Sequence, residues 1–284
     1  MGRNFLVIYT AREGSSAIMA RLSSNPNISV PLMEELDKFW IRKFYGTLDL
    51  AATFDAVFST GAFDMPHTYA RNNYLAPPRP VLDETTGQRR AVGFKWRPHG
   101  VTAALVKVLR RHEVVVFHLA RQDFLELICS LHISSSEVGG QRLGHAQFAA
   151  ARDEESRAKI RQTLNTLQVP ASLFAMSGLA LRRVGRALQH RLLVERLRRA
   201  GVRVLPLRYE AFNADPESFF RDMCARIDVE HTEDPDMLPR RQLSKVADVS
   251  AMDRVSGVDA PLVRTALGTF AKIYAWLIDI RPSA

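Results

Sequence analysis

A short polar segment, Thr10–Ser16, separates an apolar run from a stretch, Ala17–Leu22, with apolar residues at helical spacing. The glycine at position 14 lets the backbone approach an anion closely. The first amide groups of the following helix point towards that anion, and two serine hydroxyls can donate to it. The segment therefore predicts a phosphate-binding loop. An ordinary strand-to-helix turn with one of the serines as helix N-cap is the alternative.

The same segment lacks the parts of a nucleotide-hydrolysing P-loop. That loop reads Gly-x-x-x-x-Gly-Lys-[Ser/Thr], whereas here Arg12 precedes a single Gly14 and no lysine follows. The dinucleotide-binding pattern Gly-x-Gly-x-x-Gly is also absent. The sequence thus argues against an ATP-hydrolysing enzyme, a nucleotide kinase and a dehydrogenase.

A second candidate anion site follows the apolar run Val114–Leu119. Arg121 comes directly after this predicted strand, and Ser130 lies on the predicted helix Phe124–Ile133. An arginine at the end of a strand and a hydroxyl on the next helix can hold a phosphate from two sides. In the alternative, Arg121 pairs with Asp123 or Glu126 and Ser130 faces the helix backbone.

The elements around these two sites alternate between strand and helix. Strands are predicted at Asn4–Tyr9, Ile28–Val30, Ala91–Trp96, Val114–Leu119 and Val202–Leu207, and helices at Ala17–Leu22, Val101–Arg111 and Phe124–Ile133. Near-continuous apolar strands separated by helices predict an α/β fold with a central, mostly parallel sheet flanked by helices. We expect residues 1–284 to form a single domain, in which the proline-rich segment 64–90 is an exposed insertion or substrate lid.

Composition and charge narrow the class of protein. The formal net charge of +9 favours an anionic partner. Much of it lies on a predicted helix around Arg182–Arg199, which we interpret as a solvated basic face over a buried leucine stripe, with no nucleic acid as partner. No apolar run is long enough for a membrane-spanning helix. Two distant cysteines and no paired histidine ligands predict a cytoplasmic protein without a metal site.

Taken together, these motifs resemble the sulfotransferases that use 3′-phosphoadenosine-5′-phosphosulfate (PAPS), and the bacterial nodulation-factor and carbohydrate-type branch in particular. The resemblance covers nearly the whole chain in the right order. Its parts are Arg12-Glu13-Gly14-Ser15-Ser16, Asn25-Pro26-Asn27, an acidic residue near Glu34, Arg121 with Ser130, Tyr209-Glu210 with Asp215-Pro216, and a C-terminal helix at Leu262–Leu277.

The resemblance implies a P-loop-kinase-like sulfotransferase fold and transfer of a sulfuryl group from PAPS to a hydroxyl or amine. The acceptor would be a small molecule, carbohydrate or glycolipid, and no metal is needed. By resemblance, Gly14, Ser15 and Ser16 bind the 5′-phosphate, and Arg12 stabilises the leaving oxygen. Arg121 and Ser130 bind the 3′-phosphate. Lys245 closes over the nucleotide and Lys95 holds the sulfate, both from position alone. A homodimer stays open.

The general base is Glu34 or its neighbour Glu35 by resemblance to the carbohydrate branch, or His99 by resemblance to the cytosolic branch. Histidine has a suitable pKa, whereas glutamate needs its pKa raised. We favour Glu34. The sequence departs from the family at Glu13, a carboxylate beside the phosphate loop. That residue keeps an alternative open: an inactive sulfotransferase-like module that binds nucleotides or other anions.

Overall fold

The computed structural model describes residues 2–10, 14–32, 36, 41, 47–63, 79–82, 87–98, 100–135, 137–138, 141–142, 158–159, 162–163, 165–232 and 250–280. The chain divides into two compact units. The first comprises residues 1–120, 190–243 and 280–284, and the second comprises residues 121–189 and 244–279.

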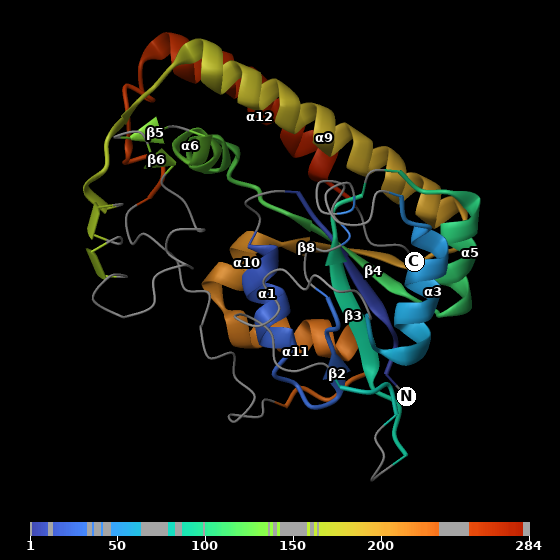
Figure 1. Ribbon diagram of the computed structural model, residues 1–284. Coiled ribbons are helices and arrows are strands. Elements are labelled where there is room, and N and C mark those ends of the chain that lie inside the picture. The colour runs from blue at the N-terminus through green and yellow to red at the C-terminus, as the bar shows by residue number, and fades with distance from the viewer. Residues whose placement is uncertain are drawn as a thin grey trace. The chain divides into compact units, whose positions relative to one another are not determined.

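The first unit is built on a five-stranded parallel sheet (Figure 1). Its strands are β1 (Phe5–Ile8), β2 (Ile28–Ser29), β3 (Ala91–Trp96), β4 (Val115–Ala120) and β8 (Val204–Arg208). They are arranged in the order β2-β3-β1-β4-β8, and every neighbouring pair is parallel. All the strands predicted from the sequence are present, and the predicted α/β fold with a parallel sheet is confirmed.

Helices cover both faces of this sheet, as alternation along the strands requires (Figure 1). Phe5 and Val7 of β1 belong to the core on one face, which includes residues of α1 (Ser15–Leu22) and α11 (Pro216–Arg226). Leu6 and Ile8 belong to the core on the other face. Residues of α3 (Leu50–Thr60), α5 (Ala103–Arg111) and the C-terminal part of α9 (Leu173–Arg199) complete it.

Polar side chains fix where these helices begin. Asp49 accepts hydrogen bonds from the amides of Ala51 and Ala52 and starts α3. Thr102 caps α5, which the sequence predicted from Val101. Asp215 caps α11 and precedes a proline at its first position, as expected for the chain around Asp215-Pro216. A short helix, α10 (Tyr209–Ala214), leads from β8 towards it.

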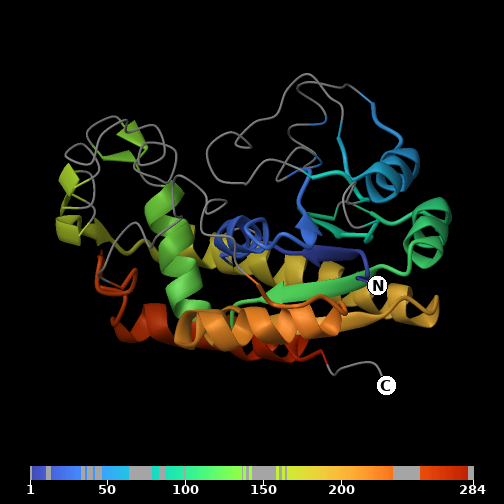
Figure 2. The same cartoon turned by 90° about the horizontal axis from the view of Figure 1, so that it is seen from below.

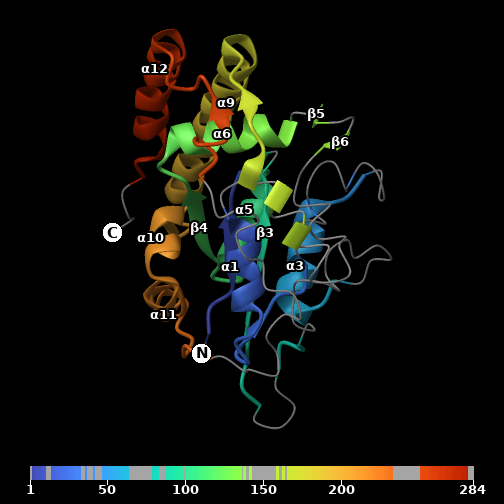
Figure 3. The same cartoon turned by 90° about the vertical axis from the view of Figure 1, so that its left-hand side faces the viewer.

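The second unit contains α6 (Phe124–Ser135), α12 (Pro261–Ile278) and the N-terminal part of α9. The Phe124 and Tyr274 rings pack 4.9 Å apart between α6 and α12, which meet in Figure 2. Helices α9 and α12 run side by side in Figures 1 and 3. Two small ladders complete the described part of this unit: β5 (Glu137–Val138) with β6 (Gln141–Arg142), and β7 (Val169–Pro170) with β9 (Val255–Ser256).

The predicted buried leucine stripe on α9 is wrong in part. Leu181, Leu188 and Leu192 are exposed, although Leu193 and Leu197 are buried as predicted. The buried positions are spaced three and four residues apart: Met176, Ala180, Arg183, Ala187, His190, Val194 and Leu197. The Arg183 guanidinium is accommodated there because it lies 3.4 Å from the Tyr274 hydroxyl and 5.6 Å from the centre of that ring.

Two expectations about organisation stay predictions. The single domain over residues 1–284 is one, and the lid role of segment 64–90 is the other, since only residues 79–82 and 87–90 of that segment are described. In this described part Val81 is buried and Leu82 pairs with Arg89 in an isolated bridge. Among the described helices of the chain, none is long and apolar enough to cross a membrane.

Candidate anion-binding site

The loop after β1 ends in a helix N-terminus suited to an anion. Gly14 adopts φ 74° and precedes the first residue of α1, Ser15. The amides of Ala17 and Ile18 both donate to the Gly14 carbonyl. Ser15 and Ser16 are the first two residues of the helix, so their amides have no acceptor inside it. No acidic residue lies in the first turn of α1. The helix therefore presents amide donors and the positive end of its dipole at the predicted phosphate loop.

Tyr209 explains why a glycine is needed at position 14. The Tyr209 ring lies so close to Gly14 that a methyl group there would overlap it, and the positive φ adds a second penalty for any other residue. Tyr209 is the first residue after β8, in the Tyr209-Glu210 pair singled out in the sequence. The structure thus brings this late segment against the loop after β1, within one unit of the chain.

Lys95 supplies a buried cation to the same loop. Its side chain is 1% exposed, and its Nζ donates to the Ser16 Oγ at 2.5 Å. The register of β3 on β1 pairs Lys95 with Val7, which sets it near the carboxyl end of both strands. Ligands bind at that edge of a parallel sheet. Of the residues assigned to the sulfate or the 5′-phosphate, the structure brings Lys95 and Ser16 together.

An aromatic ring holds this cation from a second side. The Lys95 Nζ lies 4.9 Å from the centre of the Tyr9 ring, and the Arg97 guanidinium lies 5.4 Å from the same centre. Burying an ammonium group costs free energy unless polar or aromatic partners offset it. Sequence reasoning missed Tyr9 and Arg97. Their signal was their position, one residue past the ends of two adjacent parallel strands.

The second predicted site lies in the other unit and already contains a carboxylate. Arg121 directly follows β4, and its Nη2 lies 3.5 Å from the Glu126 Oε1 on α6. Glu126 also accepts hydrogen bonds from the Ser250 hydroxyl at 2.6 Å and from the amides of Ala251 and Met252 at 2.8 and 3.0 Å. The pairing of Arg121 with Glu126, which the sequence left as an alternative, is therefore present.

Glu126 stays ionised beside Arg121. Burial by itself raises the pKa of Glu126, but the hydrogen bonds from Ser250, Ala251 and Met252 and the charge of Arg121 together lower that pKa below its ordinary value. An anion at Arg121 must share the guanidinium with this carboxylate, which five N–H donors allow.

Ser130 lies on the α6 face that carries Glu126. It is four residues further along the helix, so the two side chains are neighbours on one face. Ser130 is half-buried. Because Arg121 contacts Glu126, this face of α6 is also the one that Arg121 reaches. The role of Arg121 and Ser130 towards a phosphate stays a prediction.

The remaining predicted site residues lie outside the described part of the chain. They are Arg12, Glu34, Glu35, His99 and Lys245. Their assignments as leaving-group stabiliser, candidate bases and nucleotide-closing lysine therefore stay predictions, as does the effect of Glu13.

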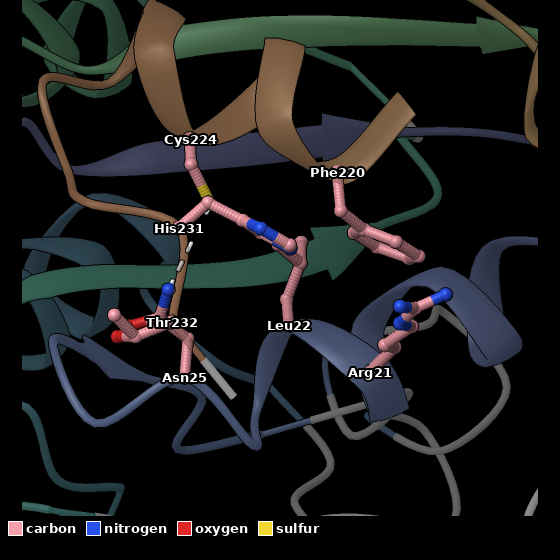
Figure 4. Close-up of a pocket in the computed structure, with 7 residues that line it drawn as sticks. All are labelled: Arg21, Leu22, Asn25, Phe220, Cys224, His231 and Thr232. Atoms are coloured by element: carbon pink, nitrogen blue, oxygen red, sulfur yellow. Dashed lines mark hydrogen bonds between the residues drawn. The ribbon is translucent and has the colours of Figure 1, made fainter. Parts of the chain in front are cut away.

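A small hollow in the first unit lies at the far end of α1 from this loop (Figure 4). Arg21 and Leu22, at the C-terminal end of α1, face Phe220 and Cys224 of α11 across it. The hollow is lined by Arg21, Leu22, Asn25, Phe220, Cys224, His231 and Thr232. It is separate from the anion-binding site, because Ser15 and Ser16 are at the opposite end of the helix.

The chain was compared with known proteins, and its fold resembles that of a solved structure. No family model matches the chain, and no curated protein matches it. A sulfotransferase from Alicyclobacillus acidocaldarius, known from its crystal structure, aligns with 98% of this chain and 95% of its own at 17% sequence identity and a TM-score of 0.42. At that score and identity the likeness does not assign a function to this chain.

Proposed function

We propose that the chain is a sulfotransferase that moves a sulfuryl group from PAPS to a hydroxyl or amine of a small-molecule or carbohydrate acceptor. The observation that supports it most is the buried ammonium of Lys95, joined to Ser16 at the start of α1. A buried cation and a helix N-terminus meet there, a combination suited to a phosphate or sulfate group.

The reaction needs positioning and positive charge more than covalent chemistry. The acceptor oxygen or nitrogen attacks sulfur, a new S–O or S–N bond forms, and the bond from sulfur to the phosphate oxygen breaks. Negative charge then builds on that phosphate oxygen. Lys95, the amides of Ser15 and Ser16 and, by resemblance, Arg12 would stabilise it. A general base takes the acceptor proton, for which we propose Glu34, with His99 as the alternative.

The nucleotide portion of the donor would be held by residues at its other phosphate. We propose that Arg121 and Ser130 bind the 3′-phosphate, and that Lys245 closes over the nucleotide. The contact of Arg121 with an ionised Glu126 keeps the guanidinium in place on one face of α6. This division of labour predicts that Lys95 serves any adenosine 5′-phosphate, whereas Arg121 serves only one that also carries a 3′-phosphate.

Transfer of radiolabelled sulfate from PAPS to a panel of sugars, glycolipids and phenols tests the proposal. We expect label in a hydroxylated or carbohydrate acceptor with the wild-type chain and none with Arg12→Ala. Lys107→Met, which changes an exposed lysine on α5, should transfer normally. If the chain binds PAPS but transfers label to no acceptor in the panel, the proposed activity is contradicted, and the result favours an inactive module that binds nucleotides or other anions.

A further inference from the structure

Three apolar side chains form an exposed stripe along the N-terminal part of α9. Phe174, Leu181 and Leu188 are 92%, 62% and 45% exposed. They are spaced seven residues apart, and a straight helix turns by about 20° per seven residues, so the three lie within roughly 40° of one another. Arg182 and Arg186 lie about 100° and 140° around the helix from Leu181, on one side of the stripe. We call the stripe together with these two arginines the α9 face.

The fold does not need this stripe. The buried positions of the same helix, such as Ala180, Arg183 and Ala187, lie on its other side. A large apolar side chain in water loses the free energy that burial would give, and scattered single cases are normal, but three in register make a patch. The patch therefore points to a surface that covers it.

The formal charge on this part of α9 is positive. From Leu173 to Gln189 the helix carries three arginines and no acidic residue. Arg183 is buried, whereas Arg182 and Arg186 are exposed. The Arg186 Nη1 donates to the Gln189 Oε1 at 3.2 Å, which holds its guanidinium along the helix surface. The covering surface should therefore be negatively charged.

We propose that the α9 face binds the surface of an anionic lipid bilayer, with α9 lying along the headgroups. A helix that combines exposed phenylalanine and leucine with arginine matches the interfacial helices of peripheral membrane proteins. The apolar side chains enter the boundary between headgroups and acyl chains, and the arginines contact anionic headgroups. The inference does not depend on the proposed function.

A second copy of the chain fits this face less well. Gly178 and Gly185 leave gaps between the apolar side chains that a partner helix could fill. However, the helix from Leu173 to Gln189 has no acidic residue that could pair with Arg182 or Arg186 of another copy. Like charges across an interface oppose association, whereas an anionic bilayer attracts the same arginines.

Sedimentation with vesicles tests the proposal. We expect the wild-type chain to bind vesicles of phosphatidylcholine and phosphatidylglycerol in equal amounts, to release them as salt is raised, and not to bind pure phosphatidylcholine. The double variant Phe174→Ser/Leu181→Ser should bind anionic vesicles roughly tenfold or more weakly. Arg182→Gln/Arg186→Gln should lose about fivefold per arginine.

Matched controls lie on other elements. Leu82→Ser changes a leucine that is 58% exposed, close to the value for Leu181, and Arg110→Gln removes an exposed arginine from α5. Neither control should alter vesicle binding. All of these side chains are exposed, so the Tm should be unchanged in every variant.

Several outcomes overturn the proposal. Absence of wild-type binding to anionic vesicles is one, and an equal loss in the control variants is another. Light scattering tests the alternative partner, a second copy of the chain. If the chain is a dimer that Phe174→Ser/Leu181→Ser dissociates, and vesicles are not bound, the face belongs to a second copy. Binding to single-stranded RNA that the arginine variant abolishes, without vesicle binding, assigns the face to nucleic acid.

Discussion

Replacing Lys95 by methionine removes the buried ammonium from the loop after β1 while keeping an unbranched side chain of similar length. The Nζ that donates to Ser16 is lost, and the apolar stem can still pack beside Tyr9. If this ammonium contacts the 5′-phosphate of a nucleotide, the variant loses one hydrogen bond between charged groups. Such a bond contributes about 1.5–3 kcal/mol, which is roughly a 10- to 150-fold rise in Kd.

Titration calorimetry with 3′-phosphoadenosine-5′-phosphate (PAP) and with AMP measures this loss. PAP and AMP both carry the 5′-phosphate, so we expect the same fold rise in Kd for the two nucleotides. Because Lys95 is 1% exposed, salt should change this rise little. Lys107→Met, on the exposed side of α5, is the matched control and should leave both Kd values unchanged. An unchanged Kd in a folded Lys95→Met variant would refute the assignment of this lysine to the 5′-phosphate.

Three further predictions follow from the described contacts. Gly14→Ala combines an unfavourable positive φ with overlap on Tyr209, so urea unfolding should show a loss of at least about 2 kcal/mol. Gly201→Ala, at φ 77° with open space around it, should lose about 1 kcal/mol, and equal losses would contradict the Tyr209 contact. Glu126→Gln should destabilise the chain at pH 7 by about 1–3 kcal/mol, because a carboxylate with three hydrogen-bond donors is lost. Since the folded pKa of Glu126 is lowered, this difference is present above the ordinary carboxyl pKa and should shrink as the pH falls through the lowered value; a difference that grows in acid would contradict it. Arg121→Gln should weaken PAP binding by roughly tenfold and leave AMP unchanged, and an equal loss for AMP would place this arginine elsewhere.

The strands could be predicted because most of their residues are apolar and buried. Ala91–Trp96 is bounded by Arg90 and by Arg97-Pro98, and β3 occupies that range. A lysine inside it is the exception to the pattern. The exception points to the candidate site, because a buried cation in a strand needs partners such as Ser16 and Tyr9 to offset its burial.

Helix α9 shows where sequence periodicity fails. Its leucines at 181, 188 and 192 are strong apolar signals, yet the helix buries Arg183 and small alanines instead. Tyr274, some ninety residues later in the chain, accommodates Arg183 and so decides which face is buried. A contact this distant in sequence cannot be read from local spacing. The contact between Tyr209 and Gly14 could not be predicted from local spacing either, because it depends on the strand order β1-β4-β8.

The central claim is that the chain binds a nucleotide with both a 5′- and a 3′-phosphate, and thermal unfolding with PAP tests it most directly. A ligand present at about 100 times its Kd adds about 2.7 kcal/mol of stability, which raises the Tm of a chain of this size by roughly 5 °C or more. We predict this rise with PAP and a clearly smaller one with AMP or ATP at the same concentration. No rise with PAP, or an equal rise with AMP, would contradict the claim.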